Sequence, residues 1–306
     1  MKALVLRPRV RKDIKSKVDR ILSELGNPEP PLKLEDVRDL LELDLSFFSG
    51  ESDGLLNVAF SRLKRAGKQI VKRPTLLRDA IKKFDLRALY LPDRKRILID
   101  DKVPKPKHRW LEAHEIGHDL LPWHGDMMLG DDEITPTPSV RDKIETEANY
   151  AAGALLFMTD RFMQECKDVE PTIKSAQKLK KRYSNTFTTT LWRMIEYMGE
   201  DKPMFGLIGQ HPCDFANDKP NFRHLIPSSS FDEMFEFPSV ETLSATVRSY
   251  CRRGRGPLGE KDVVLPGRDG SQHEFQIETF YNGYDALTLA RYSKKLPTSL
   301  FMPKLF

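Results

Sequence analysis

The stretch RWLEAHEIGHDLLPWH at residues 109–124 constrains the fold most, because it places three histidines and two glutamates within sixteen positions. Its apolar residues recur at helical spacing, which predicts a helix from about Arg109 to Leu121. His114 and His118 lie four residues apart and therefore project from one face of that helix. A helix that buries such polar groups needs either protein partners for them or a ligand that they bind.

His114, Glu115 and His118 form the H-E-x-x-H pattern, whose two histidines can bind one divalent ion from a single helix face. Glu115 follows the first histidine directly and is placed to reach a water on that ion rather than the ion itself. The pattern predicts one Zn²⁺ per chain, with Glu115 as the general base of peptide-bond hydrolysis. The alternative is an ordinary polar helix that binds no metal.

A catalytic zinc needs a third protein ligand, and the sequence offers three candidates. His124 has the spacing of one known zinc pattern, but that pattern needs a glycine where this chain has Leu121. Glu145 and Glu147 lie on a second, alanine-rich predicted helix, about 200° apart around its axis, so both cannot face the ion. Glu145 shares its face with small residues and is the favoured ligand, whereas Glu147 is expected to point toward solvent. A surface carboxylate paired with a cation is the alternative for Glu145.

Two separated motifs resemble the ImmA/IrrE family of metallopeptidases. HRWLEAHEIGHDLL has that family's R-x-x-x-A-H-E-x-G-H pattern, and ETEANYAAGALLFM follows its E-x-x-A-N-x-x-A-x-x-L-L-M pattern. The resemblance covers about residues 30–165, places the family's third zinc ligand at Glu145 and departs from the pattern only at non-ligand positions such as Tyr150. It implies a cytoplasmic peptidase that makes a restricted cut in a protein substrate, a helix-turn-helix repressor, and so derepresses stress or mobile-element genes.

The order of the expected elements indicates an α+β protein: a mainly helical zinc-peptidase core with a small β-sheet, a helical segment and a C-terminal α+β region. LDLSFFS reads as a strand, RALYLPDRKRILID as two strands joined at Pro92-Asp93, and Asn282-Gly283 as a hairpin turn. Residues 55–84 are basic with a helical pattern. The expected divisions are a basic helix at 1–29, the peptidase domain at 30–165, a helix-turn-helix-like segment at 166–200 and a candidate sensor at 201–306.

Two further roles follow from the peptidase hypothesis. Ile97, Leu98 and Ile99 offer an edge on which an extended substrate can pair, the alternative being an internal hairpin with no free edge. His124 is a candidate oxyanion stabiliser if its loop folds back over the ion.

Charge and cysteine content limit the partners. Residues 1–20 carry eight Lys/Arg and two Asp while the net charge of the chain is +5, so the remainder has no basic excess that would indicate DNA binding. Lys178, Lys180, Lys181 and Arg182 form a local basic cluster, for which a solvated helix face and DNA contact are both open. Three widely spaced cysteines fit the reducing cytoplasm, and no apolar run reaches the roughly 20 residues of a membrane span. The alternative function is a non-enzymatic, metal-containing regulator that binds a promoter or a partner.

Overall fold

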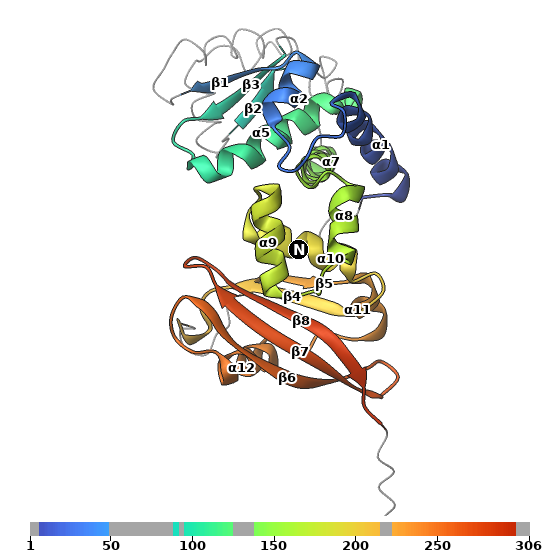
Figure 1. Cartoon of the computed structure of the whole chain (residues 1–306), viewed down its shortest axis with the longest axis vertical. Coiled ribbons are helices and arrows are strands. Elements are labelled where there is room, and N and C mark those ends of the chain that lie inside the picture. The colour runs from blue at the N-terminus through green and yellow to red at the C-terminus, as the bar shows by residue number, and fades with distance from the viewer. Residues whose placement is uncertain (1–5, 49–87, 92–94, 125–137, 215–221, 298–306) are drawn as a thin grey trace, which may run out of the picture. The chain divides into compact units, whose positions relative to one another are not determined.

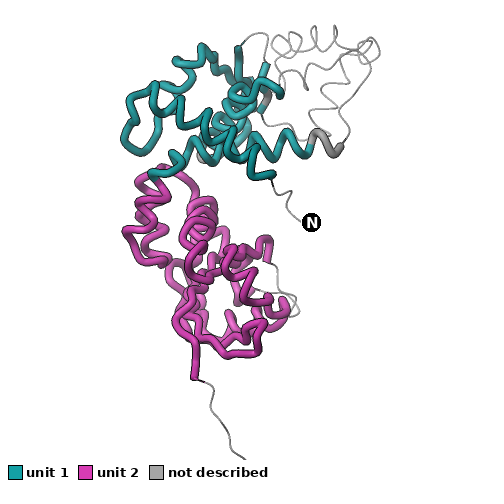
Figure 2. The backbone as a smooth tube through the Cα atoms, turned by 90° about the vertical axis from the view of Figure 1, so that its right-hand side faces the viewer, with its two compact units in different colours: residues 1–161 teal, residues 162–306 magenta. Residues whose placement is uncertain are grey.

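The structure is a computed structural model, and it describes residues 6–48, 88–91, 95–124, 138–214 and 222–297. The basic, helical pattern expected at 55–84 lies outside these residues. The chain divides into two compact units, residues 1–161 and 162–306 (Figure 2). Of the divisions expected from the sequence, the one at 165/166 lies near this boundary, whereas the one at 200/201 falls within unit 2. The difference arises because the helices between residues 173 and 198 pack on the sheet of the second unit.

Unit 1 contains helices and one small sheet (Figure 1). Its described elements are α1 (Pro8–Glu24), α2 (Leu34–Leu41), β1 (Asp44–Phe48), β2 (Ala88–Leu91), β3 (Arg96–Asp100), α5 (Lys105–Leu120), α7 (Pro138–Phe157) and the start of α8 (Asp160–Lys167). The sheet has the order β1-β3-β2, with β1 parallel and β2 antiparallel to β3. The two predicted strands are therefore present as the antiparallel β2–β3 pair, while the expected turn at Pro92-Asp93 lies outside the described residues.

The central position of β3 contradicts the expectation that Ile97, Leu98 and Ile99 form a free edge. Ile97 pairs with Leu45 on one side and with Tyr90 on the other, so β3 has neighbouring strands along both sides. The three β3 side chains are at most 1% exposed. An extended substrate has no access to the hydrogen-bonding groups of this strand, because β1 and β2 already use them.

The contact between α5 and α7 joins the two predicted motifs. Gly117 on α5 faces α7, where a Cβ at its position would lie 2.9 Å from the carbonyl oxygen of Ala148 and 3.2 Å from the Cβ of Ala151. Both alanines are fully buried. Small residues at this point let the two backbones approach closely, which brings the middle of α7 beside the H-E-x-x-H face of α5.

Unit 2 is built on a five-stranded antiparallel sheet in the order β5-β4-β8-β7-β6 (Figure 1). Its elements are the rest of α8, α9 (Ile173–Tyr183), α10 (Phe187–Met198), β4 (Met204–Gly209), β5 (Phe222–Pro227), α11 (Ser229–Met234), α12 (Val240–Tyr250), β6 (Gly256–Pro266), β7 (Gln272–Tyr281) and β8 (Ala286–Lys295). The Asn282-Gly283 turn joins β7 and β8 as the sequence predicts, and Gly283 has φ 99°, a conformation that favours glycine.

Helices cover both faces of this sheet. On one face, Phe205 and Leu207 of β4 pack with α11 and α12 in an aromatic core that includes Phe231 and Phe275. On the other face α10 contacts β4 and β5, and α9 contacts β7. Thr172 and Thr186 cap α9 and α10, each accepting a hydrogen bond from a backbone N–H three residues later. The expected helix-turn-helix-like segment is therefore a pair of helices docked on a sheet.

The described residues have an α+β fold, as predicted, with two small sheets that each pack against helices. Among the described residues, no helix has both the length and the apolar character of a membrane span.

The close approach of α5 and α7 gives a prediction for Gly117→Ala. Alanine ordinarily stabilises an exposed helical position by about 1 kcal/mol relative to glycine. Here its methyl group meets the backbone of Ala148, so we expect the free energy of unfolding to fall by about 1–3 kcal/mol. Urea denaturation of the two chains measures this change. A variant as stable as the parent would show that the contact is looser than 2.9 Å implies.

Candidate metal centre

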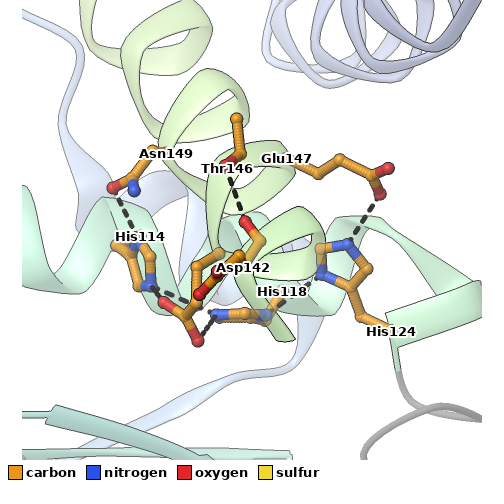
Figure 3. Close-up of polar contacts among 8 residues, drawn as sticks. His114, His118, His124, Asp142, Thr146, Glu147 and Asn149 are labelled. Carbon is orange, nitrogen blue, oxygen red and sulfur yellow. Dashed lines mark hydrogen bonds and ion pairs between the residues drawn. The ribbon is translucent and has the colours of Figure 1, made fainter. Parts of the chain in front are cut away.

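Helix α5 presents the H-E-x-x-H residues from its last two turns. It starts at a proline-rich N-terminus and ends at Leu120, and the backbone of the C-cap residue Leu121 is extended just before Pro122. Ala113, Ile116 and Leu120 bury its apolar side. His114 and His118 project together from the side that faces α7 (Figure 3).

Three side chains converge at this point. The Nε2 atoms of His114 and His118 lie 3.1 Å apart. A carboxylate oxygen of Glu145 lies 3.2 Å from Nε2 of His114, and its other oxygen lies 3.9 Å from Nε2 of His118. These donor atoms all lie within 4.8 Å of one another, so the group can hold a metal ion. The structure thus brings together His114, His118 and Glu145, the three side chains that the sequence singled out as ligands.

The donor set fits a divalent metal in both chemistry and spacing. Bonds of about 2.0–2.2 Å in tetrahedral geometry put ligand atoms about 3.3 Å apart, close to the separations found here. The His118 and His114 side chains are 3% and 13% exposed, whereas Glu145 is 47% exposed. The centre is therefore buried behind the histidines and accessible from the side of Glu145.

Glu115 is buried, and its surroundings shift the pKa of its carboxyl group. Its side chain is 6% exposed, and burial raises its pKa to about 7. The positive charge of His114 lowers this pKa, the negative charge of Glu145 raises it, and a hydrogen bond from the backbone N–H of Tyr90 lowers it. A carboxyl group with a pKa near neutrality can both accept and return a proton, which is what general acid–base catalysis needs.

The pKa values of the two histidines of the pattern shift in opposite directions. Burial lowers the pKa of His114, but its hydrogen bond to Glu145 and the charges of Glu115 and Glu145 raise it by more, so it lies above its usual range. Burial and the neighbouring charge of His114 lower the pKa of His118. Without a metal, any proton shared by the pair is therefore expected on His114.

His124 and Glu147 lie behind His118 (Figure 3). The two Nδ1 atoms of His118 and His124 are 3.0 Å apart, and Nε2 of His124 is 3.0 Å from a carboxylate oxygen of Glu147. His124 is 0% exposed and has both ring nitrogens engaged. This placement contradicts the expectation that His124 stabilises an oxyanion, because no ring nitrogen is left to face a substrate.

The expectation that Glu147 points toward solvent is also wrong. Its side chain is 2% exposed, and Nε1 of Trp123 donates to it over 2.7 Å. The angle of about 200° between Glu145 and Glu147 correctly predicted that they face different sides of α7, but the side of Glu147 is not exposed to solvent. In fact α7 packs against α1 as well as α5. Apolar residues on every side of the helix were the sequence signal of this burial.

Two other side chains near the centre had no predicted role. Oδ1 of Asn149 lies 3.1 Å from Nδ1 of His114, on the exposed side of the site. Asn149 is part of the second family motif, which was the available signal. Asp119 accepts hydrogen bonds from the hydroxyl of Tyr90 and from Lys95, and these bonds tie α5 to the β2–β3 hairpin. No local pattern indicated this second contact, because it joins residues 24 and 29 positions apart.

The family model described as the IrrE N-terminal-like domain, a peptidase family, matches residues 64–194. The IrrE N-terminal-like match contains both motifs of the candidate metal centre and extends through α9 into α10.

The solved structure of a Mycobacterium tuberculosis transcriptional regulator is similar to most of this chain, with a TM-score of 0.50 and 14% identity. The match covers 92% of this chain and 88% of that one, and at this identity it shows the fold alone. No curated protein matches the chain.

The raised pKa of Glu115 predicts a pH-dependent stability for the metal-free chain. Its pKa is about 7 when folded and near 4.5 when unfolded, so its contribution is fully present below pH 4.5 and is lost as pH rises through 7. Glu115→Gln removes this dependence. The variant should match the parent near pH 4.5 and exceed it by up to about 3 kcal/mol near pH 8, at about 1.4 kcal/mol per pKa unit. Urea denaturation in the presence of a chelator at several pH values measures the difference, and two parallel curves would contradict it.

Proposed function

We propose that this chain is an intracellular zinc-dependent endopeptidase that makes a restricted cut in a protein substrate, a helix-turn-helix transcriptional repressor. The observation that carries the proposal is the convergence of His114, His118 and Glu145 beside the buried carboxyl group of Glu115. A buried polar helix without a metal is a poorer account, since it leaves two imidazoles and a carboxylate packed together with no ligand.

Each of the four residues has a role in this proposal. His114, His118 and Glu145 hold the metal, and Glu115 moves the proton. Bound zinc would supply Lewis-acid chemistry by polarising the scissile carbonyl and making water more acidic. Glu115 takes a proton from the attacking water and later passes it to the leaving amine. A pKa near 7 suits both halves of that transfer.

The substrate is expected to enter from the side of Glu145 and Asn149, the more exposed side chains of the site. A narrow choice of substrate fits a centre in which both histidines are largely covered. The match of residues 64–194 to the IrrE N-terminal-like family supports a repressor as the substrate, because the ImmA/IrrE resemblance implies that class. Cys166, Cys213 and Cys251 are free thiols, which supports a reducing compartment.

The central experiment compares the parent with Glu115→Gln. The variant should bind zinc with unchanged stoichiometry, because Glu115 is not among the three converging ligands. It should lose cleavage by at least about 1,000-fold, since the proton acceptor is gone. Labelling of new protein N-termini in host cells that express each chain identifies the cut in whichever protein carries it. Metal content by atomic emission confirms that the site remains loaded.

The matched control is Glu112→Gln, which also changes a glutamate on α5. Glu112 pairs with Arg38 over 2.7 Å and is not among the converging donor atoms. This variant should keep the N-terminal peptides that the parent produces. The endopeptidase proposal fails if Glu115→Gln generates the same new N-termini as the parent.

A second function, that of a non-enzymatic regulator, is favoured by one observation. Helix α9 exposes a group of cations that can contact phosphates: Lys174, Lys178, Lys180 and Lys181. Arg182, in the same cluster, pairs with both carboxylate oxygens of Glu165. One solved structure that resembles this chain is that of a transcriptional regulator, which is compatible with this alternative.

The two functions predict opposite results in one transcript-profiling experiment. If the chain is an endopeptidase, Glu115→Gln abolishes the change in host transcripts that the parent causes, and a triple Lys178, Lys180 and Lys181 to Ala variant keeps it. If the chain acts by binding a promoter, the triple variant loses the response and Glu115→Gln keeps it. We expect the first pattern.

A further inference from the structure

A series of buried, hydrogen-bonded polar groups extends from His118 in the direction away from the candidate metal centre (Figure 3). Nδ1 of His118 meets Nδ1 of His124, and Nε2 of His124 meets Glu147, each over 3.0 Å. The indole N–H of Trp123 donates to the same oxygen of Glu147. His118, His124 and Glu147 are 3%, 0% and 2% exposed. Removing one of these partners would therefore leave a buried polar group without a hydrogen bond, which destabilises the fold.

The order of donors and acceptors in this series determines where the proton of His118 lies. An ionised carboxylate only accepts hydrogen bonds, so Nε2 of His124 must donate to Glu147. A neutral His124 then has a lone pair on Nδ1, and Nδ1 of His118 must donate to it. The lone pair of His118 is left on Nε2, the atom that faces His114 and Glu145.

We propose that Glu147 and His124 are positioning residues that hold His118 in the tautomer and ring orientation needed to bind metal. The proposal rests on the proposed zinc site. A carboxylate or carbonyl commonly accepts the second ring N–H of a metal-binding histidine. Here a second imidazole stands between the carboxylate and the ligand, and Trp123 and Lys143 also contact that carboxylate.

The two histidines of the centre are held in different ways. His114 has the exposed amide oxygen of Asn149 as the partner of its Nδ1 atom. His118 has a buried network that ends in a full charge. A neutral, exposed acceptor orients a ring less strongly than a buried charged network does. His118 is therefore the more rigid of the two, and the centre depends on Glu147 for that rigidity.

The test uses Glu147→Gln with Asp142→Asn as its control. Both substitutions remove one carboxylate charge from α7, but Asp142 is exposed and is not part of the converging metal-type group. Zinc affinity is measured by competition with a chelator of known affinity. Glu147→Gln should weaken zinc binding by about 10- to 100-fold. A neutral amide can donate as well as accept, so it no longer determines which ring nitrogens of His124 and His118 donate. Asp142→Asn should change the affinity by less than about twofold.

A second readout needs no metal. Long-range ¹H–¹⁵N spectra of the imidazoles in the metal-free chain report which ring nitrogen carries the proton. In the parent, His118 should carry its proton on Nδ1. In Glu147→Gln, this tautomer should give way to a mixture, whereas Asp142→Asn should leave it unchanged. His124→Gln interrupts the same series of hydrogen bonds at its middle. It replaces Glu147→Gln as the test variant if circular dichroism shows that Glu147→Gln does not fold.

The outcomes separate this inference from the proposed function. If His118 carries its proton on Nε2 in the parent, or if both Glu147→Gln and His124→Gln keep the parent's tautomer and zinc affinity, the positioning role is overturned. A parent that binds zinc but cuts no protein overturns the endopeptidase and leaves the positioning role standing. A parent that binds no zinc overturns the proposed function, and the spectra of the metal-free chains still decide how His118 is held.

Discussion

The close packing of α5 on α7 is the contact on which the candidate metal centre depends. Two ligands come from α5 and the third from α7, so the centre exists only where these helices meet at short range. Gly117 against Ala148 and Ala151 makes that range possible, since any larger side chain at Gly117 would meet backbone. The same contact brings Asn149 to His114.

Burying several ionisable groups in a small volume costs desolvation free energy, and the structure offsets this cost by pairing the groups. Glu147 accepts from Trp123 and His124, and Asp119 accepts from Tyr90 and Lys95. Glu115 retains part of the cost, which appears as its raised pKa. A destabilised carboxyl group beside three converging metal-type donors is the pattern expected of a reactive centre rather than of a structural helix pair.

The family match and the compact units divide the chain differently. The IrrE N-terminal-like match continues through α9 into α10, yet these helices belong to the compact unit built on the second sheet. Their apolar faces explain the difference, because α10 contacts β4 and β5 while α9 contacts β7. A segment can therefore share the sequence pattern of one family domain and still bury its core side chains against a neighbouring sheet.

The sequence by itself determined the features that depend on short spacing. The four-residue interval puts His114 and His118 on one helix face, helical period separates Glu145 from Glu147, and Asn282-Gly283 marks the β7–β8 turn. Only the tertiary structure decided what lies opposite each face. Whether β3 is an edge strand depends on β1, about 50 residues earlier in the chain. Whether Glu147 is exposed to solvent depends on the packing of α7 against α1 and on the contact with His124. Spacing specifies the direction in which a side chain leaves its own helix or strand. The burial and the partners of that side chain depend on elements that are distant in sequence, and no local sequence pattern predicts where those elements pack.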